Sequence, residues 1–490
     1  MSSAEKEEGI RGPASADSGP FPSFVPTRKQ KSRHRGKCGN VAPARRAALD
    51  ALVRSEARGL FLDESLEEVC RQFDLSPQDR RLAMEITYGV TRFRGRLDHI
   101  LGVYINQGLE SVPPPVLPVL RCAAYQILHL TRVPPFAAVH DAVELARTMG
   151  CEGLTALVNA VLRALIRRDR EVRFPSWEKD PVGHLVAVHS HPRHLVETWL
   201  DRWPAEQVHN LCRFNNETAP ICGRINRLKV SNPDERDDRE PFDLGSPPAE
   251  CSVPGCLLLS LKGSPADWPA VSRGYVTIQD PAATVVSPLL SLEPGMRVWD
   301  VCAAPGGKCT HCAEIMDDTG CVIASDLSLR RLRAVDENRR RLGLTCLDLV
   351  VADGLHPPWR PREESFDAIL LDVPCTGWGT FRRHPDLRWR LSPEDPERLG
   401  RRALDLLTSV SRHLRQGGVL VYATCTLSHE ENEDVVDRFL AGHRDWCLEP
   451  VTRWLPHSCQ TMVADEGWVF VFPPEARMDG LFAARLRKGT

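Results

Sequence analysis

The sequence has no long hydrophobic run and no large excess of charge of either sign. No apolar stretch approaches the roughly 20 residues of a membrane-spanning helix, which argues against a membrane protein. Lysine and arginine total 63 and aspartate and glutamate 65, so the formal net charge is only −2. Because there is no global positive field, any contact with nucleic acid must come from local basic patches.

The features of a secreted protein are also missing. Residues 1–20 are polar and have no apolar core, so we expect no signal peptide. The 17 cysteines are scattered through 490 residues, unlike the dense disulfide framework of a small secreted domain. We therefore expect free thiols in a reducing cytoplasm. Cys309 and Cys312 form a CxxC pair inside a predicted helix without a second ligand pair nearby, so we expect packing and no metal site.

Changes in composition predict four parts of the chain. Residues 1–40 are rich in serine, proline, glycine and charge, and predict a disordered basic tail. Residues 41–175 have helical periodicity interrupted by prolines, and predict an all-α bundle without a catalytic constellation. Residues 176–273 predict a linker and a small α+β subdomain, and residues 274–490 a catalytic α/β domain.

The last part alternates short apolar runs with helical segments. This alternation predicts a doubly wound parallel sheet, whose strands we expect at residues 297–302, 321–325, 348–352, 366–371 and 418–423. Two further runs, at 468–472 and 481–486, have no room for a crossover helix between them. We expect these two to form an antiparallel terminal pair.

The loop after the first strand consists of small residues and glycines, which let a ligand approach the backbone closely. It is neither the GxGxxG of a dinucleotide site nor the GxxxxGK[ST] of a P-loop, so it suits a nucleoside cofactor without a phosphate nest. The candidate cofactor-binding residues of this loop are Cys302, Ala303, Ala304, Pro305, Gly306, Gly307 and Lys308.

Acids follow the next two strands. Asp326 lies twenty residues beyond Gly306, the offset at which a carboxylate accepts hydrogen bonds from ribose hydroxyls. Asp353 ends the third strand and is placed to bind an exocyclic amine such as adenine N6, and we add Arg331 to the same site. Each acid has a plainer alternative, because carboxylates at strand ends also cap the helix that follows.

Cysteines follow the fourth and fifth strands, as Pro-Cys375 and Thr-Cys425. Cysteine is a strong nucleophile whose pKa is readily lowered, and a thiolate added at C6 of cytosine makes C5 reactive toward a methyl group. The C5 proton must then leave, so a second acid–base group is useful. Asp372 is placed to hydrogen-bond N3 or N4 of the base and also borders the cofactor. From the residues alone, either cysteine can be the one that attacks.

Together these segments resemble the RNA cytosine-5 methyltransferases of the Nop/Sun family, most closely its RsmB type. The matching motifs are residues 274–280, 300–308, 372–380, 382–386, 422–427, 430–433, 479–482 and 484–488. The resemblance implies a Rossmann-like enzyme that transfers methyl from S-adenosylmethionine to C5 of a cytosine in 16S rRNA. It also implies that Cys425 forms the adduct with C6 and that Cys375 assists product release. The chain departs from the family pattern at Val373, Thr376, Trp378 and Thr380.

The helical part resembles the antitermination factor NusB, which members of the RsmB type carry at their N-terminus. The matching segments are residues 88–89, 120–126, 132–134, 139–143 and 158–163. This resemblance implies that residues 41–175 form an RNA-binding domain, and we expect residues 176–273 to hold a second RNA-binding subdomain. We expect a cytoplasmic monomer with no membrane partner.

Two groups of arginines are candidate RNA contacts: Arg382, Arg383 and Arg388 beside the fourth motif, and Arg167 and Arg168 at the end of the helical domain.

Two other functions stay open. One is a tRNA cytosine-5 methyltransferase with the same site, against which the NusB-like domain favours rRNA. The other is a non-catalytic RNA-binding factor with a degenerate methyltransferase domain. The presence of Lys308, Asp326, Cys375 and Cys425 argues against the second.

Overall fold

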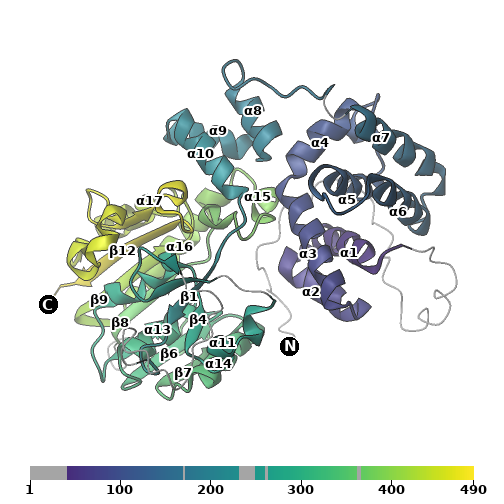
Figure 1. The fold of residues 1–490 in the computed structure, drawn as a ribbon. Coiled ribbons are helices and arrows are strands. Elements are labelled where there is room, and N and C mark those ends of the chain that lie inside the picture. The colour runs from purple at the N-terminus through teal and green to yellow at the C-terminus, as the bar shows by residue number, and fades with distance from the viewer. Residues whose placement is uncertain (1–40, 169–170, 231–248, 260–262, 361–365, 490) are drawn as a thin grey trace, which may run out of the picture. The chain divides into compact units, whose positions relative to one another are not determined.

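The computed structural model describes residues 41–168, 171–230, 249–259, 263–360 and 366–489 (Figure 1). The expected basic tail at residues 1–40 lies outside this range. The chain divides into two compact units: unit 1 runs to Glu217 and includes His384–Pro393, and unit 2 comprises Thr218–Arg383 and Glu394–Thr490. Among the described residues, no helix has the length and apolar character needed to cross a bilayer.

The described part of unit 1 is helical. Its helices are α1 (Pro43–Arg58), α2 (Leu62–Phe73), α3 (Pro77–Arg92), α4 (Arg94–Val103), α5 (Val116–His129), α6 (Pro135–Thr148), α7 (Thr155–Arg168), α8 (Pro181–His189), α9 (Arg193–Arg202), α10 (Ala205–Asn215) and α15 (Leu387–Arg390). The expected all-α bundle is thus confirmed.

Local signals explain where several of these helices begin and how they pack. Helix α3 begins at Pro77, directly after its N-cap Ser76. The side chain of Ser76 accepts a hydrogen bond from the backbone of Asp79. In α1, alanines at three- and four-residue spacing form a buried face that packs into the core of the first seven helices.

The described part of unit 2 contains two sheets. The smaller one has the order β2-β3-β1-β4, with strands Ala249–Glu250, Cys256–Leu259, Ile221–Ile225 and Val276–Ile278 in that order, all antiparallel. Because β4 pairs with β1, this sheet includes strands from both sides of residue 273.

The larger sheet carries the expected doubly wound fold. Its order is β10-β12-β9-β8-β5-β6-β7, and β11 pairs with β12. The parallel strands are β5 (Arg297–Asp300), β6 (Cys321–Asp326), β7 (Leu347–Val351), β8 (Phe366–Asp372) and β9 (Leu414–Thr424). The predicted terminal pair is β11 (Val469–Val471) with β12 (Leu481–Lys488), which is antiparallel as expected; β10 (Trp446–Leu448) completes the sheet.

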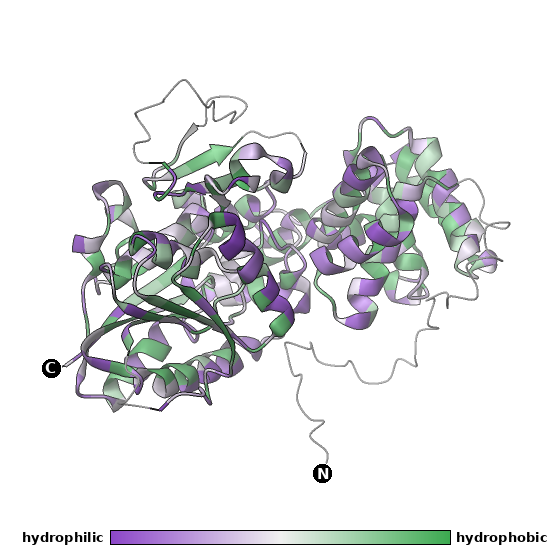
Figure 2. Cartoon of the chain, turned by 90° about the horizontal axis from the view of Figure 1, so that it is seen from below, coloured by the Kyte–Doolittle hydropathy of each residue, from purple (hydrophilic) through white to green (hydrophobic). Residues whose placement is uncertain are grey.

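Successive residues of the central strands point to opposite faces, and both faces are buried. In β8, Ala368 and Leu370 join the core cluster beneath α13 (Gly307–Ile315) and α14 (Leu329–Leu342), whereas Ile369 and Leu371 join the cluster beneath α16 (Asp395–Ser411) and α17 (Glu433–Gly442). This burial explains why the strands are almost continuously hydrophobic (Figure 2). The short helices α11 (Pro269–Ser272), α12 (Pro281–Thr284) and α18 (Pro473–Ala476) complete the unit.

The strand order places the site. From β5 the chain runs outward through β6 and β7, then returns to the other side of β5 for β8 and β9. The direction of winding therefore reverses between β5 and β8. Ligands of folds of this kind bind at the carboxyl edge of the sheet at such a point.

Candidate active site

The loop after β5 lies close to the backbone of β6 and of α14. Ala303 donates a backbone hydrogen bond to the carbonyl of Ser325 at 2.8 Å, which ties the loop to the end of β6. Gly306 has a φ of +107°, and a Cβ at this position would lie 3.2 Å from Cα of Val335 on α14. Glycine is therefore required both by the backbone conformation and by the close approach of α14.

Asp326 combines a structural contact with a free acceptor. One carboxylate oxygen, Oδ1, accepts a hydrogen bond from the backbone of Ser328 at 3.0 Å. The other, Oδ2, is buried, accepts no hydrogen bond from the described residues and lies 3.4 Å from the guanidinium of Arg331. A buried acceptor without a donor costs free energy unless a ligand supplies one, so Oδ2 fits a ribose hydroxyl.

Asp353 lies in the turn after β7, where its Oδ1 accepts a hydrogen bond from the backbone of Leu355 at 3.0 Å. Its side chain is partly exposed at the same edge of the sheet. These turn contacts occupy one oxygen of each acid. Neither acid caps a helix among the described residues, because the cap of α14 is Ser328 and the element after β7 is the strand β8.

The two cysteines are brought together by the register of β8 and β9. Asp372 pairs with Ala423, so Cys375 and Cys425 leave adjacent parallel strands at the same edge. Their sulfur atoms lie 3.3 Å apart. The hydrogen bond with Cys425, and after it burial, raise the pKa of Cys375 well above its usual value. Cys375 therefore keeps its proton while Cys425 lies beside it.

A partly buried ion pair lies near the thiols. Lys308 Nζ on α13 lies 2.6 Å from Asp372 Oδ2 at the end of β8. Burial is the largest single influence and lowers the pKa of Lys308. The charge and hydrogen bond of Asp372 and further negative charges nearby together outweigh it, so the pKa is raised and the lysine stays cationic. Asp300 ends β5 beside this pair, and burial followed by the charge of Asp372 raises the pKa of Asp300 to about 8. Its carboxyl is therefore protonated at neutral pH.

A buried hydrogen-bond network holds the two cysteine turns together, and none of its residues was assigned to the site from the sequence. The backbone and hydroxyl of Thr376 both donate to the carboxylate of Glu431, at 2.8 Å and 2.5 Å. The Thr376 hydroxyl also lies 2.6 Å from that of Thr426. Glu431 lies in the 430–433 motif, so its position in that motif was the available signal. Burial raises the pKa of Glu431 to about 7.

Asn432 extends this network to the end of β9. Its amide donates to the carbonyl of Thr426 at 3.1 Å, and its side-chain oxygen accepts from the hydroxyl of Thr424 at 2.5 Å. Both neighbours of Cys425 in the chain are therefore held by one buried side chain. The position of the Cys425 thiol is set by these contacts.

The arginines beside the fourth motif do not form the exposed patch that we expected. Arg388 is fully buried, and its guanidinium donates to the carbonyls of Ser190 at 3.2 Å and Asn215 at 3.1 Å. Arg382 is 3% exposed. Arg383 forms ion pairs with Asp280 and Asp479. The expectation of an RNA-contacting surface is therefore wrong for Arg382 and Arg388, since their side chains are buried, while the guanidinium of Arg383 is already neutralised by two carboxylates.

Arg167 and Arg168 end α7, and both side chains are exposed. Their contact with RNA stays a prediction.

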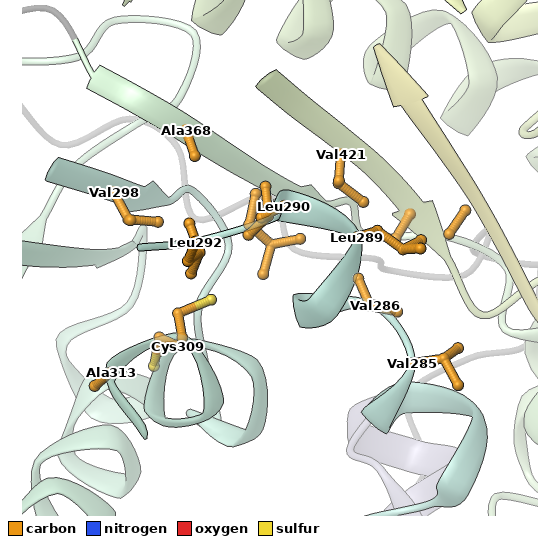
Figure 3. Packing of buried hydrophobic residues seen from close by; sticks show 14 of the residues in the cluster. Val285, Val286, Leu289, Leu290, Leu292, Val298, Cys309, Ala313, Ala368 and Val421 are labelled. Atoms are coloured by element: carbon orange, nitrogen blue, oxygen red, sulfur yellow. The ribbon is translucent and has the colours of Figure 1, made fainter. Parts of the chain in front are cut away.

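The cysteines of the CxxC pair pack in the core of unit 2, as expected. Cys309 and Cys312 are fully buried on α13. Figure 3 shows Cys309 among side chains that include Leu292 and, from β5, Val298.

Comparisons with known proteins cover nearly the whole chain. The matching family models are 16S rRNA methyltransferase RsmB/F over residues 287–487, the NusB family over residues 42–167, and a ferredoxin-like domain of RsmF/B-like methyltransferases over residues 191–236. A probable ribosomal RNA small subunit methyltransferase B from Synechocystis is 34% identical over 447 residues, covering 91% of this chain and 99% of the relative. The Bacillus subtilis counterpart is 33% identical, with 90% and 98% covered.

Solved structures agree in fold. A crystal structure described as PH0851 matches with a TM-score of 0.73 and 25% identity, covering 92% of this chain and 100% of the other. A methyltransferase homolog protein from Pyrococcus horikoshii matches with a TM-score of 0.52 and 26% identity, covering 62% of this chain and 97% of the other.

Proposed function

Because the chain belongs to the ribosomal RNA small subunit methyltransferase B family, we propose that it methylates C5 of a cytosine in 16S rRNA through a covalent bond between Cys425 and C6. Membership makes the chain a methyltransferase, and S-adenosylmethionine is the methyl donor. The observation that carries the finer proposal is the 3.3 Å separation of the Cys375 and Cys425 sulfurs beside the Lys308–Asp372 pair. A base held by one thiol is then within reach of the other.

The cofactor site comprises the loop of residues 302–308 with Asp326, Arg331, Asp353 and Asp372. When bound, S-adenosylmethionine supplies its methyl group as an electrophile. The buried Oδ2 of Asp326 would accept a hydrogen bond from a ribose hydroxyl, and the glycine-rich loop would let the nucleoside approach the backbone. Asp353 would accept a hydrogen bond from the exocyclic amine N6 of the adenine of S-adenosylmethionine.

The chemistry of the pair follows from the hydrogen bond between the two sulfur atoms, in which either thiol can be the donor. In the reactive form that we propose, Cys375 is the donor, and the cationic Lys308 interacts favourably with a thiolate at Cys425. The Cys425 thiolate bonds to C6 and makes C5 nucleophilic. Asp372 hydrogen-bonds the base at N3 or N4 and stabilises the adduct.

Cys375 acts in the second half of the reaction. Its pKa is raised by the hydrogen bond with Cys425 and by the charge of that thiolate. Once Cys425 is bonded to carbon, both influences disappear, and the Cys375 thiol becomes a better acid–base group. The Cys375 thiol can then lose its proton to solvent, and once the methyl group is on C5 the Cys375 thiolate takes the C5 proton. The electrons of that C–H bond restore the C5–C6 double bond and expel Cys425 as a thiolate, which returns the free enzyme.

The rest of the chain presents the RNA. We assign RNA binding to the helical domain at residues 41–175, with Arg167 and Arg168, and to the subdomain at residues 176–273, and catalysis to residues 274–490. The target cytosine must be unstacked or single-stranded to reach thiols at the carboxyl edge of a sheet. We expect the protein to act as a monomer in the cytoplasm.

The test uses 16S rRNA transcribed with cytosine tritiated at C5. Incubation with the full-length chain and S-adenosylmethionine should release tritium to water in step with methyl transfer, and nuclease digestion should yield 5-methylcytidine. A tRNA pool is the alternative substrate. Methyl transfer without tritium release would exclude C5 as the target. Transfer to tRNA alone would reject the rRNA substrate but leave the chemistry intact.

A further inference from the structure

Three histidines gather in unit 1, in a region that plays no part in the proposed catalysis. His184 and His189 lie on α8, and His209 lies on α10. One ring nitrogen from each lies within 4.8 Å of the other two, and all three side chains are partly buried. Imidazole nitrogens around a tetrahedral Zn²⁺ are about 3.4 Å apart, given Zn–N bonds of about 2.0–2.1 Å. Small side-chain rotations therefore bring the three nitrogens to a common ion.

The tautomer of His184 is set by its surroundings. Its Nδ1 lies 2.8 Å from the carbonyl oxygen of Pro175, which can only accept a hydrogen bond, so Nδ1 carries the proton. Its Nε2 is then left with a lone pair. A hydrogen bond from the second ring nitrogen to a backbone carbonyl is the arrangement that orients metal-binding histidines in proteins.

His189 and His209 face each other through their Nε2 atoms, which lie 3.0 Å apart. One proton between the two nitrogens makes an ordinary hydrogen bond, whereas a metal ion in its place uses both lone pairs. The third nitrogen, from His184, favours a metal ion over a shared proton, because a single proton cannot bind three acceptor nitrogens at once.

An aromatic ring fixes the cluster from one side. Trp177 stacks on His209 with ring centroids 4.7 Å apart and meets the edge of His184 at 5.8 Å. The two imidazoles are therefore held against the same indole. Partial exposure of the histidines leaves room for water as a fourth ligand.

We propose that His184, His189 and His209 form a three-histidine site for a divalent transition metal such as Zn²⁺. An all-nitrogen donor set selects this class of ion over Mg²⁺ and Ca²⁺, which prefer oxygen ligands. A bound ion would cross-link α8 to α10 in unit 1. This histidine site shares no residue with the methyltransferase site.

The test measures metal binding directly on the tag-free, full-length chain. After removal of metal with a chelator, the protein is loaded with Zn²⁺ or Co²⁺, passed through a desalting column and assayed by elemental mass spectrometry. We expect one ion per chain and visible Co²⁺ absorption bands of a tetrahedral nitrogen site. His209→Ala and His184→Ala should each weaken Co²⁺ binding by roughly 100-fold.

Trp177 offers a second, local measurement. Co²⁺ at the site should quench its fluorescence, and Trp177→Phe should remove that part of the quenching while metal stoichiometry stays at one. The matched control is His457→Ala, an exposed histidine in the 3₁₀ helix His457–Met462 of unit 2, which should bind metal like the wild type. Circular dichroism in chelator verifies that the variants are folded.

Two results would overturn the proposal. One is a wild-type chain that retains no Zn²⁺ or Co²⁺, which would leave an ordinary hydrogen bond between His189 and His209. The other is a folded His184→Ala/His209→Ala chain that binds Co²⁺ with unchanged stoichiometry and spectrum, which would place the metal elsewhere.

Discussion

The sulfur atoms of Cys375 and Cys425 lie 3.3 Å apart, although the two residues are 50 positions apart in the chain. Adjacent parallel strands end in register at this point, so each strand delivers one thiol to the same place. At this separation the two thiols hydrogen-bond, and a bond between Cys425 and the base would remove one cause of the raised pKa of Cys375. Their roles are therefore separable by removing one at a time.

Cys425→Ala should abolish methyl transfer and form no covalent complex with RNA, since no thiolate remains to attack C6. Cys375→Ala should still attack and methylate but fail to release, and should accumulate a protein–RNA complex stable to denaturing electrophoresis. A trapped complex from Cys425→Ala and none from Cys375→Ala would reverse the two assignments. Full activity of both variants would discard the covalent mechanism.

Asp326→Asn should weaken S-adenosylmethionine binding by roughly 2 kcal/mol, or about 30-fold, because a charged acceptor for the ribose becomes a donor. The substitution retains the oxygen that accepts from the backbone of Ser328, so the turn is preserved. Titration calorimetry measures the affinity, with the exposed Asp465→Asn as the matched control. Equal affinities for the two variants would remove Asp326 from the ribose site.

Glu431 should make the protein less stable as the pH rises. Its pKa in the folded chain is raised from 4.5 to about 7, so between these values the folded state binds more protons than the unfolded state. The free energy of unfolding therefore falls by roughly 3 kcal/mol across this window and is constant above it. Glu431→Gln should lack this loss, so its stability relative to wild type should improve between pH 4.5 and pH 8 in denaturant unfolding. A difference independent of pH would contradict the raised pKa.

Gly379→Ala should disturb the turn that carries the nucleophile. The backbone of Gly379 donates to the carbonyl of Cys425 at 3.0 Å, and a Cβ there would lie 2.8 Å from that oxygen and 2.5 Å from Cα of Gly480. We expect a loss of about 1–3 kcal/mol in thermal unfolding and a lower rate of methyl transfer. Gly442→Ala, where a Cβ meets nothing within 4 Å, should change neither.

Arginines of the two groups should behave in opposite ways. Arg388→Ala should cost roughly 3 kcal/mol of stability, because buried carbonyls of Ser190 and Asn215 lose their donor, and the salt dependence of RNA binding should stay the same. Arg167→Ala with Arg168→Ala should leave stability unchanged but lower the log–log salt slope by about 1.4–1.8. An unchanged slope for the latter pair would remove it from the RNA surface.

Much of the architecture was predictable because it depends on short-range patterns. The apolar runs predicted β5 to β9 to within a few residues, and the missing crossover predicted the antiparallel pairing of β11 with β12. The turn after each parallel strand had to fall at one edge of the sheet, so the placement of Asp326, Cys375 and Cys425 along that edge followed from topology. The motifs around these residues were sufficient to identify the family.

The tertiary structure decided what depends on residues far apart in the chain. Arg388 belongs to a charge-rich segment that is typical of a surface, yet it is buried because carbonyls about 170 to 200 residues earlier surround it. Glu431 supports the cysteine turns only because Thr376 comes to it from the turn after β8. His184 and His209 have no common motif, and their meeting depends on the packing of α8 with α10. By itself the sequence determined the periodicity, the strand ends and the reactive residue types, since these are local. Burial, hydrogen-bond partners and proton affinity were decided only by the fold, because each is a property of the surroundings that distant segments supply.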